Sequence, residues 1–132
     1  MCARLRLLVA DDNEVLRMGL RTLIGDKHGW QVCGEATNGE EAVARVRELA
    51  PDVIILDLTM PVMNGFQAAE EIRRIAPSTK IVFFSVHEVP VTAREVGAHT
   101  FVSKSCAVKE LVTTIERVAG QPRRASSNVM SA

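Results

Sequence analysis

Two kinds of segment alternate along the chain, and few folds are compatible with that order. Short runs rich in β-branched and other apolar residues are typical of strands, whereas apolar residues that recur every three or four positions are typical of helices. The predicted strands are Leu5–Ala10, Gln31–Ala36, Val53–Leu56, Lys80–Phe84 and Phe101–Ser103. The predicted helices are Val15–Ile24, Gly39–Leu49, Gly65–Ile75, Val91–Val96 and Ala107–Ala119. Strict alternation with connections of this length predicts an α/β fold, a parallel sheet with helices on both faces.

Each predicted helix should bury one apolar face against the sheet. The expected apolar faces are Val15, Leu16, Gly19, Leu20, Leu23 and Ile24 in the first helix, and Val108, Leu111, Val112, Ile115 and Val118 in the last. Asn13 and Asn38 precede helices and are predicted N-caps. The final segment, "GQPRRASSNVMSA", has no apolar periodicity. We therefore expect one folded domain over residues 4–119, followed by a flexible tail or the start of a linker over residues 120–132.

The composition favours a single globular domain with no net charge. The chain has 132 residues, 47% of them hydrophobic, and its 16 basic side chains balance 16 acidic ones. A net charge of zero gives no general attraction for nucleic acid or anionic lipid, so this chain alone should bind neither. Because no apolar stretch could span a bilayer and the N-terminus lacks the apolar run of a signal peptide, we expect a cytoplasmic protein. The cysteines and histidines are scattered, which argues against a disulfide framework or a zinc site.

Acidic side chains directly follow two of the predicted strands. The first strand runs into "VADDNE", which contains Asp11 and Asp12, and the third runs into "ILDLTMP", which contains Asp57. Because the carboxyl ends of neighbouring parallel strands form the ligand-binding crevice of open α/β sheets, we expect the three carboxylates to lie together. Carboxylate oxygens suit Mg²⁺, and a cation would relieve the repulsion among them. The alternative for Asp12, that it only caps the next helix, leaves Asp57 unexplained.

Two further polar groups end the fourth and fifth strands at the same edge. "KIVFFS" ends in Ser85, and "FVSKS" contains Lys104. A hydroxyl and an ammonium beside carboxylates and a metal ion suit the binding of a phosphoryl group, with a carboxylate oxygen as the nucleophile. Taken singly, each of these residues is more often a solvated surface residue. Their joint position at the ends of the strands favours a function.

With these motifs, residues 5 to about 119 resemble the receiver domain of bacterial two-component response regulators. The resemblance rests on "VADDNEVLR", "IILDLTMPVMNG", "FFSVHE" and "GAHTFVSK", and it is strongest to receivers of the LuxR or NarL type. It implies a flavodoxin-like (βα)5 fold, doubly wound, with strand order 2-1-3-4-5. It also implies that Asp57 is the phosphoacceptor and that Lys104 and Ser85 contact the phosphoryl group. The implied ligands of Mg²⁺ are Asp11, Asp12, Asp57 and the backbone carbonyl of Thr59.

The function implied by the resemblance is signal transduction. A sensor histidine kinase phosphorylates Asp57 with the help of Mg²⁺, and a switch at Ser85 and Phe101 then controls an output, expected to be transcription. No enzymatic turnover is implied beyond self-catalysed phosphorylation and dephosphorylation. Thr59 and His87 are candidates for tuning dephosphorylation, with ordinary loop residues as the alternative. A phosphorylation-dependent homodimer and, in a longer protein, a DNA-binding output domain are compatible with the resemblance.

Three other interpretations share part of this pattern. The stretch between Ser85 and Lys104 is shorter than in typical receivers by about one helical turn, which predicts a shortened helix four and keeps open a degenerate receiver-like module that is not regulated by phosphorylation. A phosphatase of the haloacid dehalogenase type also uses an aspartate nucleophile, but Thr59 stands where its second acid would be. A flavin-binding protein would need a phosphate loop rich in Ser, Thr and Gly after the first strand, and none follows.

Overall fold

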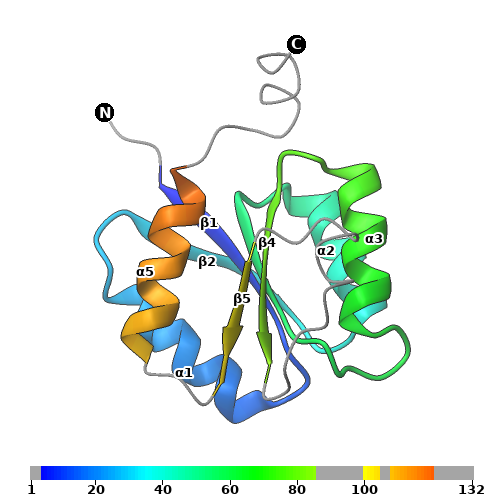
Figure 1. Cartoon of the computed structure of the whole chain (residues 1–132), viewed down its shortest axis with the longest axis horizontal. Coiled ribbons are helices and arrows are strands. Elements are labelled where there is room, and N and C mark those ends of the chain that lie inside the picture. The colour runs from blue at the N-terminus through cyan, green and yellow to red at the C-terminus, as the bar shows by residue number, and fades with distance from the viewer. Residues whose placement is uncertain (1–3, 86–99, 105–107, 121–132) are drawn as a thin grey trace.

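A computed structural model of the chain describes residues 4–85, 100–104 and 108–120. The elements formed by these residues are, in chain order, β1 (Leu5–Ala10), α1 (Glu14–Gly25), β2 (Trp30–Ala36), α2 (Gly39–Leu49), β3 (Val53–Leu56), α3 (Gly65–Ile75), β4 (Lys80–Ser85), β5 (Thr100–Ser103) and α5 (Val108–Ala119). The strands form one sheet in the order β2-β1-β3-β4-β5, and every neighbouring pair is parallel (Figure 1). The predicted α/β fold and strand order are therefore confirmed.

The predicted and observed elements differ by no more than one residue at either end wherever the structure describes the chain. For example, β2 begins at Trp30 rather than Gln31, and β4 extends to Ser85 rather than Phe84. The predicted helix Val91–Val96, and with it the shortened helix four, lies outside the described residues. Residues 121–132 of the predicted tail lie outside them as well.

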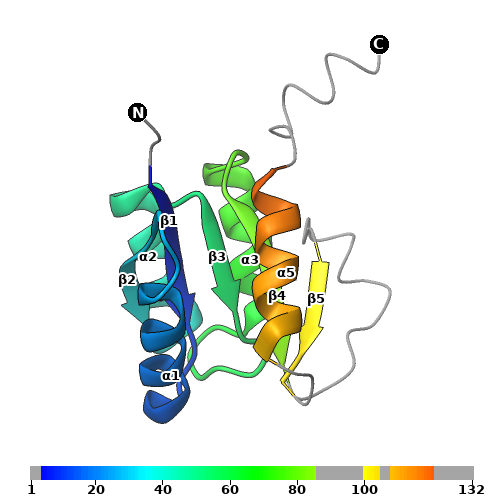
Figure 2. The ribbon, with the colours of Figure 1, turned by 90° about the vertical axis from the view of Figure 1, so that its left-hand side faces the viewer.

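The sheet is packed on both faces, so the domain has two apolar cores. Helices α2 and α3 cover one face, and α1 and α5 cover the other (Figures 1 and 2). Alternate side chains of a strand point to opposite faces, so Ile54 and Leu56 of β3 enter the first core while Val53 and Ile55 enter the second. All four are at most 2% exposed, which explains why this strand is a continuous apolar run. Burial on both faces makes β3 the central strand, and Asp57 follows it directly.

Three helices begin with an asparagine cap near the carboxyl edge of the sheet. The side-chain oxygens of Asn13, Asn38 and Asn64 each accept a hydrogen bond from the backbone N–H three residues later. The two predicted N-caps are thus confirmed, and Asn64 adds a third as part of a capping box. These caps define where α1, α2 and α3 start, and therefore the length of the loops that carry the polar residues of this edge.

The predicted apolar face of α1 was partly wrong. Leu16, Leu20, Leu23 and Ile24 pack toward the core that α1 shares with α5, but Val15 is 77% exposed and Gly19 is also exposed. Successive residues of a helix are rotated by about 100°, so Leu16, Leu20 and Ile24 lie along one stripe. Leu23 lies closer to the centre of this stripe than Gly19 or Val15 does, and Gly19 and Val15 therefore face the solvent.

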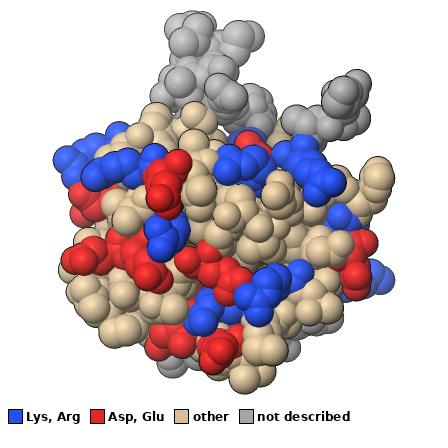
Figure 3. All heavy atoms as spheres, turned by 180° about the vertical axis from the view of Figure 1, so that it is seen from behind, with Lys and Arg blue, Asp and Glu red and all other residues tan. Residues whose placement is uncertain are grey.

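Charged side chains of both signs are interspersed on the face shown in Figure 3, where neither sign forms an extended patch. This distribution agrees with the balance of 16 basic and 16 acidic side chains. Within the part of the chain that the structure describes, no helix has the length and apolar character needed to cross a bilayer.

Candidate functional site

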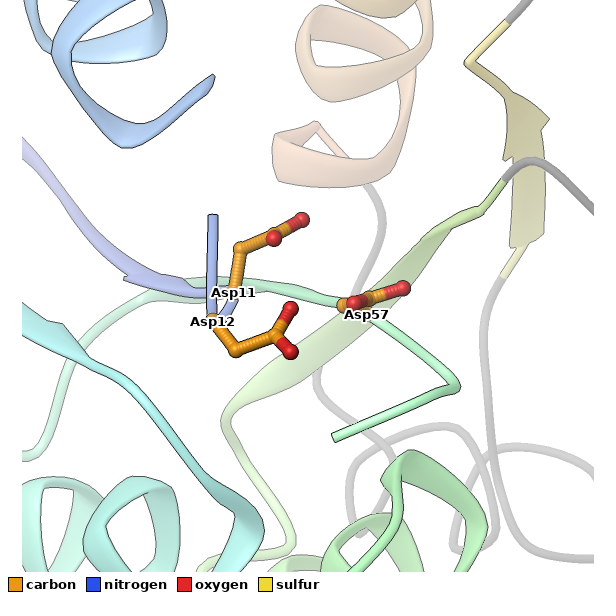
Figure 4. Close-up of side chains that lie close together, drawn as sticks. All are labelled: Asp11, Asp12 and Asp57. Atoms are coloured by element: carbon orange, nitrogen blue, oxygen red, sulfur yellow. The ribbon is translucent and has the colours of Figure 1, made fainter. Parts of the chain in front are cut away.

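Three carboxylates lie close together at the carboxyl edge of the sheet (Figure 4). Asp11 and Asp12 follow β1, and Asp57 follows β3. One carboxylate oxygen from each residue lies within 4.8 Å of those of the other two. Asp11 and Asp57 are buried, each 3% exposed, whereas Asp12 is exposed to solvent. The structure thus brings together the three predicted carboxylates. Asp11 and Asp57 form a buried pair, and the exposed Asp12 leaves the site open to solvent on one side.

The register of the strands brings Asp57 beside β1. Ala10 and Leu56, the last residues of β1 and β3, are paired, and the N–H of Asp57 donates to the carbonyl oxygen of Ala10 at 3.0 Å. The other side of Asp57 is fixed by a close approach of α3. A Cβ atom on Gly65 would overlap the carbonyl oxygen of Asp57, so the glycine allows the first turn of α3 to pack directly against this backbone.

Lys104 places its ammonium group beside two of the three carboxylates, those of Asp11 and Asp57. It follows β5, and its backbone N–H donates to the carbonyl oxygen of Ser85 at 2.8 Å. Its Nζ lies 2.7 Å from Oδ2 of Asp11 and 3.5 Å from Oδ1 of Asp57. The Lys104 side chain is only 16% exposed, so salt screens this interaction less than it screens a surface ion pair. One ammonium cannot neutralise three carboxylates, and the site therefore keeps an excess of negative charge.

The surroundings of Asp57 raise the pKa of its carboxyl group above the ordinary value of 3.8. Burial is the largest cause because it disfavours the charged form, and the negative charge of Asp11 acts in the same direction. The ammonium of Lys104 and the N–H of Thr59, 3.4 Å from Oδ1 of Asp57, lower the pKa and offset part of this effect. The ionised form of Asp57 would therefore be stabilised by a further positive charge.

The donor set is compatible with Mg²⁺. All three side chains offer carboxylate oxygens, the ligand atoms that Mg²⁺ prefers. Asp12 is exposed, so solvent at this side of the site could supply the water molecules that complete the coordination of the ion. Asp11 already accepts hydrogen bonds through both oxygens, from the N–H of Asn13 at 2.9 Å and from Lys104. A cation bound here would therefore compete with Lys104 for Oδ2 of Asp11.

The structure places the remaining predicted site residues as follows. Ser85 is the last residue of β4 and is completely buried at the same edge. Thr59 is exposed two residues beyond Asp57, and its N–H contact with that carboxylate is longer than an ordinary hydrogen bond. Phe101 belongs to β5, but its side chain lies outside the described residues, as does all of His87.

Three charged residues that were not predicted from the sequence form a network of contacts beside this edge. Nη1 of Arg17, on α1, donates to the carbonyl oxygen of Asp11 at 2.8 Å. Nε of Arg17 donates to Oε1 of Glu35 on β2 at 3.1 Å, and Arg21 pairs with the other oxygen of Glu35. The available signal was weak, because these opposite charges belong to elements that meet only in the folded chain.

Comparison with known proteins identifies the family. The model of the response regulator receiver domain matches residues 7–116. The chemotaxis protein CheY of Thermotoga maritima is 39% identical over 117 residues, which cover 86% of this chain and 97% of that protein. The response regulator GacA of Pseudomonas viridiflava is 36% identical over 121 residues, which cover 89% of this chain and 56% of that protein. The chain therefore spans nearly all of CheY but only about half the length of GacA.

A similar solved structure is that of a two-component response regulator of the LuxR family from Aurantimonas sp. SI85-9A1. It has a TM-score of 0.86 and 34% sequence identity, with 92% of this chain and 89% of that chain covered. The likeness thus extends over most of the chain rather than over one motif. The chain belongs to the response regulator receiver domains, the signalling domains of two-component systems, and its relatives include regulators of the LuxR type.

Proposed function

We propose that this chain is a phosphoacceptor receiver in which phosphorylation of Asp57 depends on Mg²⁺ and shifts a conformational switch. The observation that carries the proposal is the setting of Asp57. This buried carboxylate follows the central strand, has oxygens close to those of Asp11 and Asp12, and lies 3.5 Å from the ammonium of Lys104. Membership of the receiver family supports the same role.

In the proposed reaction, a carboxylate oxygen of Asp57 attacks the phosphorus atom of the donor. A new P–O bond forms to Asp57 while the bond from phosphorus to the donor breaks, and its electron pair leaves with the donor. The donor is the phosphorylated imidazole of a sensor histidine kinase, or a small acyl phosphate such as acetyl phosphate in vitro. Dephosphorylation is the attack of water on the same phosphorus atom, which restores the carboxylate. No other catalytic turnover is proposed.

Mg²⁺ is proposed to be held by the carboxylates of Asp11, Asp12 and Asp57 and by the backbone carbonyl of Thr59. When bound, the ion supplies charge neutralisation at the attacking and transferred oxygens. Lys104 would exchange its contact with Asp11 for one with the phosphoryl oxygens. Asp12, exposed beside the two buried acids, is suited to hold the ion at the open side of the site.

The proposed switch links Ser85 and Phe101. Phosphorylation adds negative charge and acceptor oxygens at the edge where Ser85 and Lys104 lie. The N–H of Lys104 donates a hydrogen bond of 2.8 Å to the carbonyl of Ser85, and this bond joins the ends of β4 and β5. A movement of Ser85 would therefore displace the end of β5, the strand that contains Phe101. Such a group acts by changing the relative stability of two conformations.

Thr59 and His87 are proposed to set the rate of dephosphorylation. The exposed position of Thr59 beside Asp57 is where a side chain could orient or hinder the attacking water. Exchanging both residues for alanine should change the lifetime of the phosphorylated protein in buffer without changing Mg²⁺ affinity. An unaltered lifetime would contradict this role.

The partners proposed from family membership are a sensor histidine kinase and, after phosphorylation, a second copy of the chain. Residues 4–119 are the proposed receiver, and residues 120–132 a tail or the start of a linker. Because the chain spans 56% of GacA, we propose that output is exerted by a DNA-binding domain where one accompanies the receiver, with transcription as the output. The proposed location is the cytoplasm, with neither membrane nor nucleic acid bound by this chain alone.

Incubation with acetyl phosphate tests the proposal directly. Intact-protein mass spectrometry should detect the addition of one phosphoryl group when Mg²⁺ is present and none when it is chelated. Asp57→Asn should prevent the addition, whereas Asp26→Asn, at an exposed position after α1, should leave it unchanged. Phosphorylation that persists in Asp57→Asn would contradict the assignment of the phosphoacceptor.

Two readouts separate the main alternatives. In the acetyl phosphate samples, a receiver-like module that is not regulated by phosphorylation would show no mass increase under any condition. In a separate assay with a small phosphate ester, a phosphatase would release phosphate over many turnovers, whereas the proposed receiver, whose donors are a phosphorylated imidazole or an acyl phosphate, should release none.

A further inference from the structure

We infer that Arg17, oriented by Glu35, is a positioning residue that prepares the acidic edge of the sheet for a divalent cation. It acts through the backbone of Asp11, because its guanidinium group contacts the main-chain carbonyl oxygen of that residue at 2.8 Å. The inference rests on the proposed function, since the affinity that it concerns is that of the three carboxylates for Mg²⁺.

Hydrogen bonds to four other residues hold Asp11. Its N–H donates to the carbonyl of Ala36 at 3.0 Å, and its own carbonyl accepts from Arg17 at 2.8 Å. Its Oδ1 accepts from the N–H of Asn13 at 2.9 Å, and its Oδ2 accepts from Lys104 at 2.7 Å. A cation would compete for the last of these contacts. The other three then define where the turn between β1 and α1 presents Asp11 and its neighbour Asp12.

Glu35 in turn holds Arg17. Nε of Arg17 lies 3.1 Å from Oε1 of Glu35, and the two side chains are only 14% and 23% exposed. Glu35 precedes Ala36 in β2, so the end of this strand reaches Asp11 both directly, through the Ala36 carbonyl, and indirectly, through Arg17. The guanidinium group can make both contacts because its donors are fixed in one plane, a geometry that the single ammonium of lysine cannot reproduce.

Positioning and simple charge predict opposite effects of removing Arg17. Arg17 adds positive charge near the acidic edge, so by Coulomb repulsion alone its loss should strengthen Mg²⁺ binding. If Arg17 instead holds the turn, its loss should weaken binding, because the carboxylates must then be ordered when the cation arrives. Residues that orient metal ligands typically change metal affinity by about 10- to 100-fold, so the sign of the change identifies the role.

Arg17→Met and Arg21→Met form a matched pair for the test. Both substitutions remove a guanidinium group of α1 that pairs with Glu35. Arg21, however, is 51% exposed and pairs with Oε2 of Glu35, whereas Arg17 pairs with Oε1. Isothermal titration calorimetry with Mg²⁺ should give about tenfold weaker binding for Arg17→Met and a change within about twofold for Arg21→Met. Arg17→Lys should lie between Arg17→Met and the wild type, because an ammonium can reach the Asp11 carbonyl without also binding Glu35.

A second measurement needs no metal. The amide hydrogen of Asn13 is bonded to Oδ1 of Asp11, so its exchange with solvent, followed by nuclear magnetic resonance, reports on the turn. Exchange should be faster in Arg17→Met than in the wild type and in Arg21→Met. If Arg17→Met does not fold, Arg17→Lys takes its place in both measurements, with a smaller loss of affinity.

The outcomes distinguish this inference from the proposed function. Unchanged or tighter Mg²⁺ binding in Arg17→Met would overturn the inference, even if the variant unfolds at lower urea concentration, since Arg17 would then be a structural residue only. If the wild type itself binds no Mg²⁺, the proposed function fails instead. In that case, if the Asn13 amide exchanges at the same rate in Arg17→Met as in the wild type, the inference that Arg17 positions the turn is also wrong. Faster exchange would show that Arg17 holds the turn between β1 and α1 even though no Mg²⁺ binds.

Discussion

Nζ of Lys104 lies 2.7 Å from Oδ2 of Asp11 but 3.5 Å from Oδ1 of Asp57. The lysine proposed to contact a phosphoryl group on Asp57 is therefore bound more closely to a proposed metal ligand. A divalent cation bound as proposed would neutralise the same buried carboxylate as Lys104, so the two would compete for Asp11. The charge balance of the site would then depend on which of them contacts that carboxylate.

Replacing Lys104 with methionine should therefore strengthen Mg²⁺ binding while slowing phosphorylation by acetyl phosphate. Binding should tighten because a competitor and a positive charge are both removed, and phosphoryl transfer should slow because a group that stabilises the phosphoryl oxygens is lost. Calorimetry and the rate of mass increase measure the two effects separately. Weaker Mg²⁺ binding in Lys104→Met would contradict the competition.

The same substitution should lower stability in buffer without divalent cations. Loss of the ammonium leaves the buried acids Asp11 and Asp57 without their cation, and breaking such a pair costs about 3 kcal/mol. Lys27→Met, which breaks a more exposed pair with Glu116, should cost less than about 1 kcal/mol. Urea unfolding measures both free energies. Equal effects of the two substitutions would show that the acidic edge does not need Lys104.

Asp57→Asn should increase stability near neutral pH when no divalent cation is added. Burial and the charge of Asp11 raise the pKa of Asp57 in the folded protein above its ordinary value of 3.8. Between the unfolded and folded pKa values the native state binds more protons, so stability falls as pH rises through this window, and the full loss is present above the folded pKa. Asparagine carries no charge and avoids this loss.

The stabilisation by Asp57→Asn should be fully present above the folded pKa of Asp57 and should shrink as the pH falls from that value toward about 4. Urea unfolding at several pH values measures it, with Asp26→Asn as the exposed control. An increase that stayed constant down to the acidic end of this range would show that a cause other than the ionisation of Asp57 is responsible.

Mg²⁺ should stabilise the folded chain, and Asp12→Asn should reduce that effect. A ligand that binds only the native state adds about 2.7 kcal/mol when its free concentration is 100 times its Kd. Asp12 is exposed, so the substitution alone should change the free energy of unfolding little. Thermal unfolding with Mg²⁺ and after chelation measures the difference. Equal stabilisation of wild type and Asp12→Asn would exclude Asp12 as a ligand.

Val62→Asn should stabilise the protein. Val62 has a φ of 69°, which β-branched residues rarely adopt, and Met63 donates to the carbonyl of Pro61 across it at 2.7 Å, as in the strained form of the γ-turn. Asparagine tolerates a positive φ better than a β-branched residue does, so the free energy of unfolding should rise by about 1 kcal/mol. Val15→Asn is the control, at a helical position with almost the same exposure, 77% against 76%. Equal effects at the two positions would rule out backbone strain at Val62.

The predictable part of the site is the part that strand ends determine. An apolar run that ends in a carboxylate marks where a strand leaves the sheet, and parallel pairing then brings Asp11 and Asp57 to one edge. The local patterns needed for this inference are short and continuous in the sequence. The same holds for the caps Asn13 and Asn38, since capping involves residues three positions apart.

Features that depend on tertiary geometry were not predictable in the same way. The contact of Arg17 with Glu35 joins α1 to β2, and apolar periodicity says nothing about which polar side chains meet across that interface. Apolar periodicity predicts Val15 on the apolar face of α1, but its rotation relative to the stripe that packs on the sheet leaves it exposed. Nothing in the residue type of Val62 indicates its left-handed backbone.

If Asp57 accepts a phosphoryl group beside a divalent cation held by its acidic neighbours, a crystal structure of the protein with Mg²⁺ and beryllium fluoride, which mimics a phosphoryl group, should show both ions at this edge. We expect beryllium bonded to a carboxylate oxygen of Asp57, Mg²⁺ bound by Asp11 and Asp12, and Lys104 moved from Asp11 to a fluorine atom. Lys104 still bound to Asp11, with neither ion at the site, would contradict the proposed phosphoacceptor site.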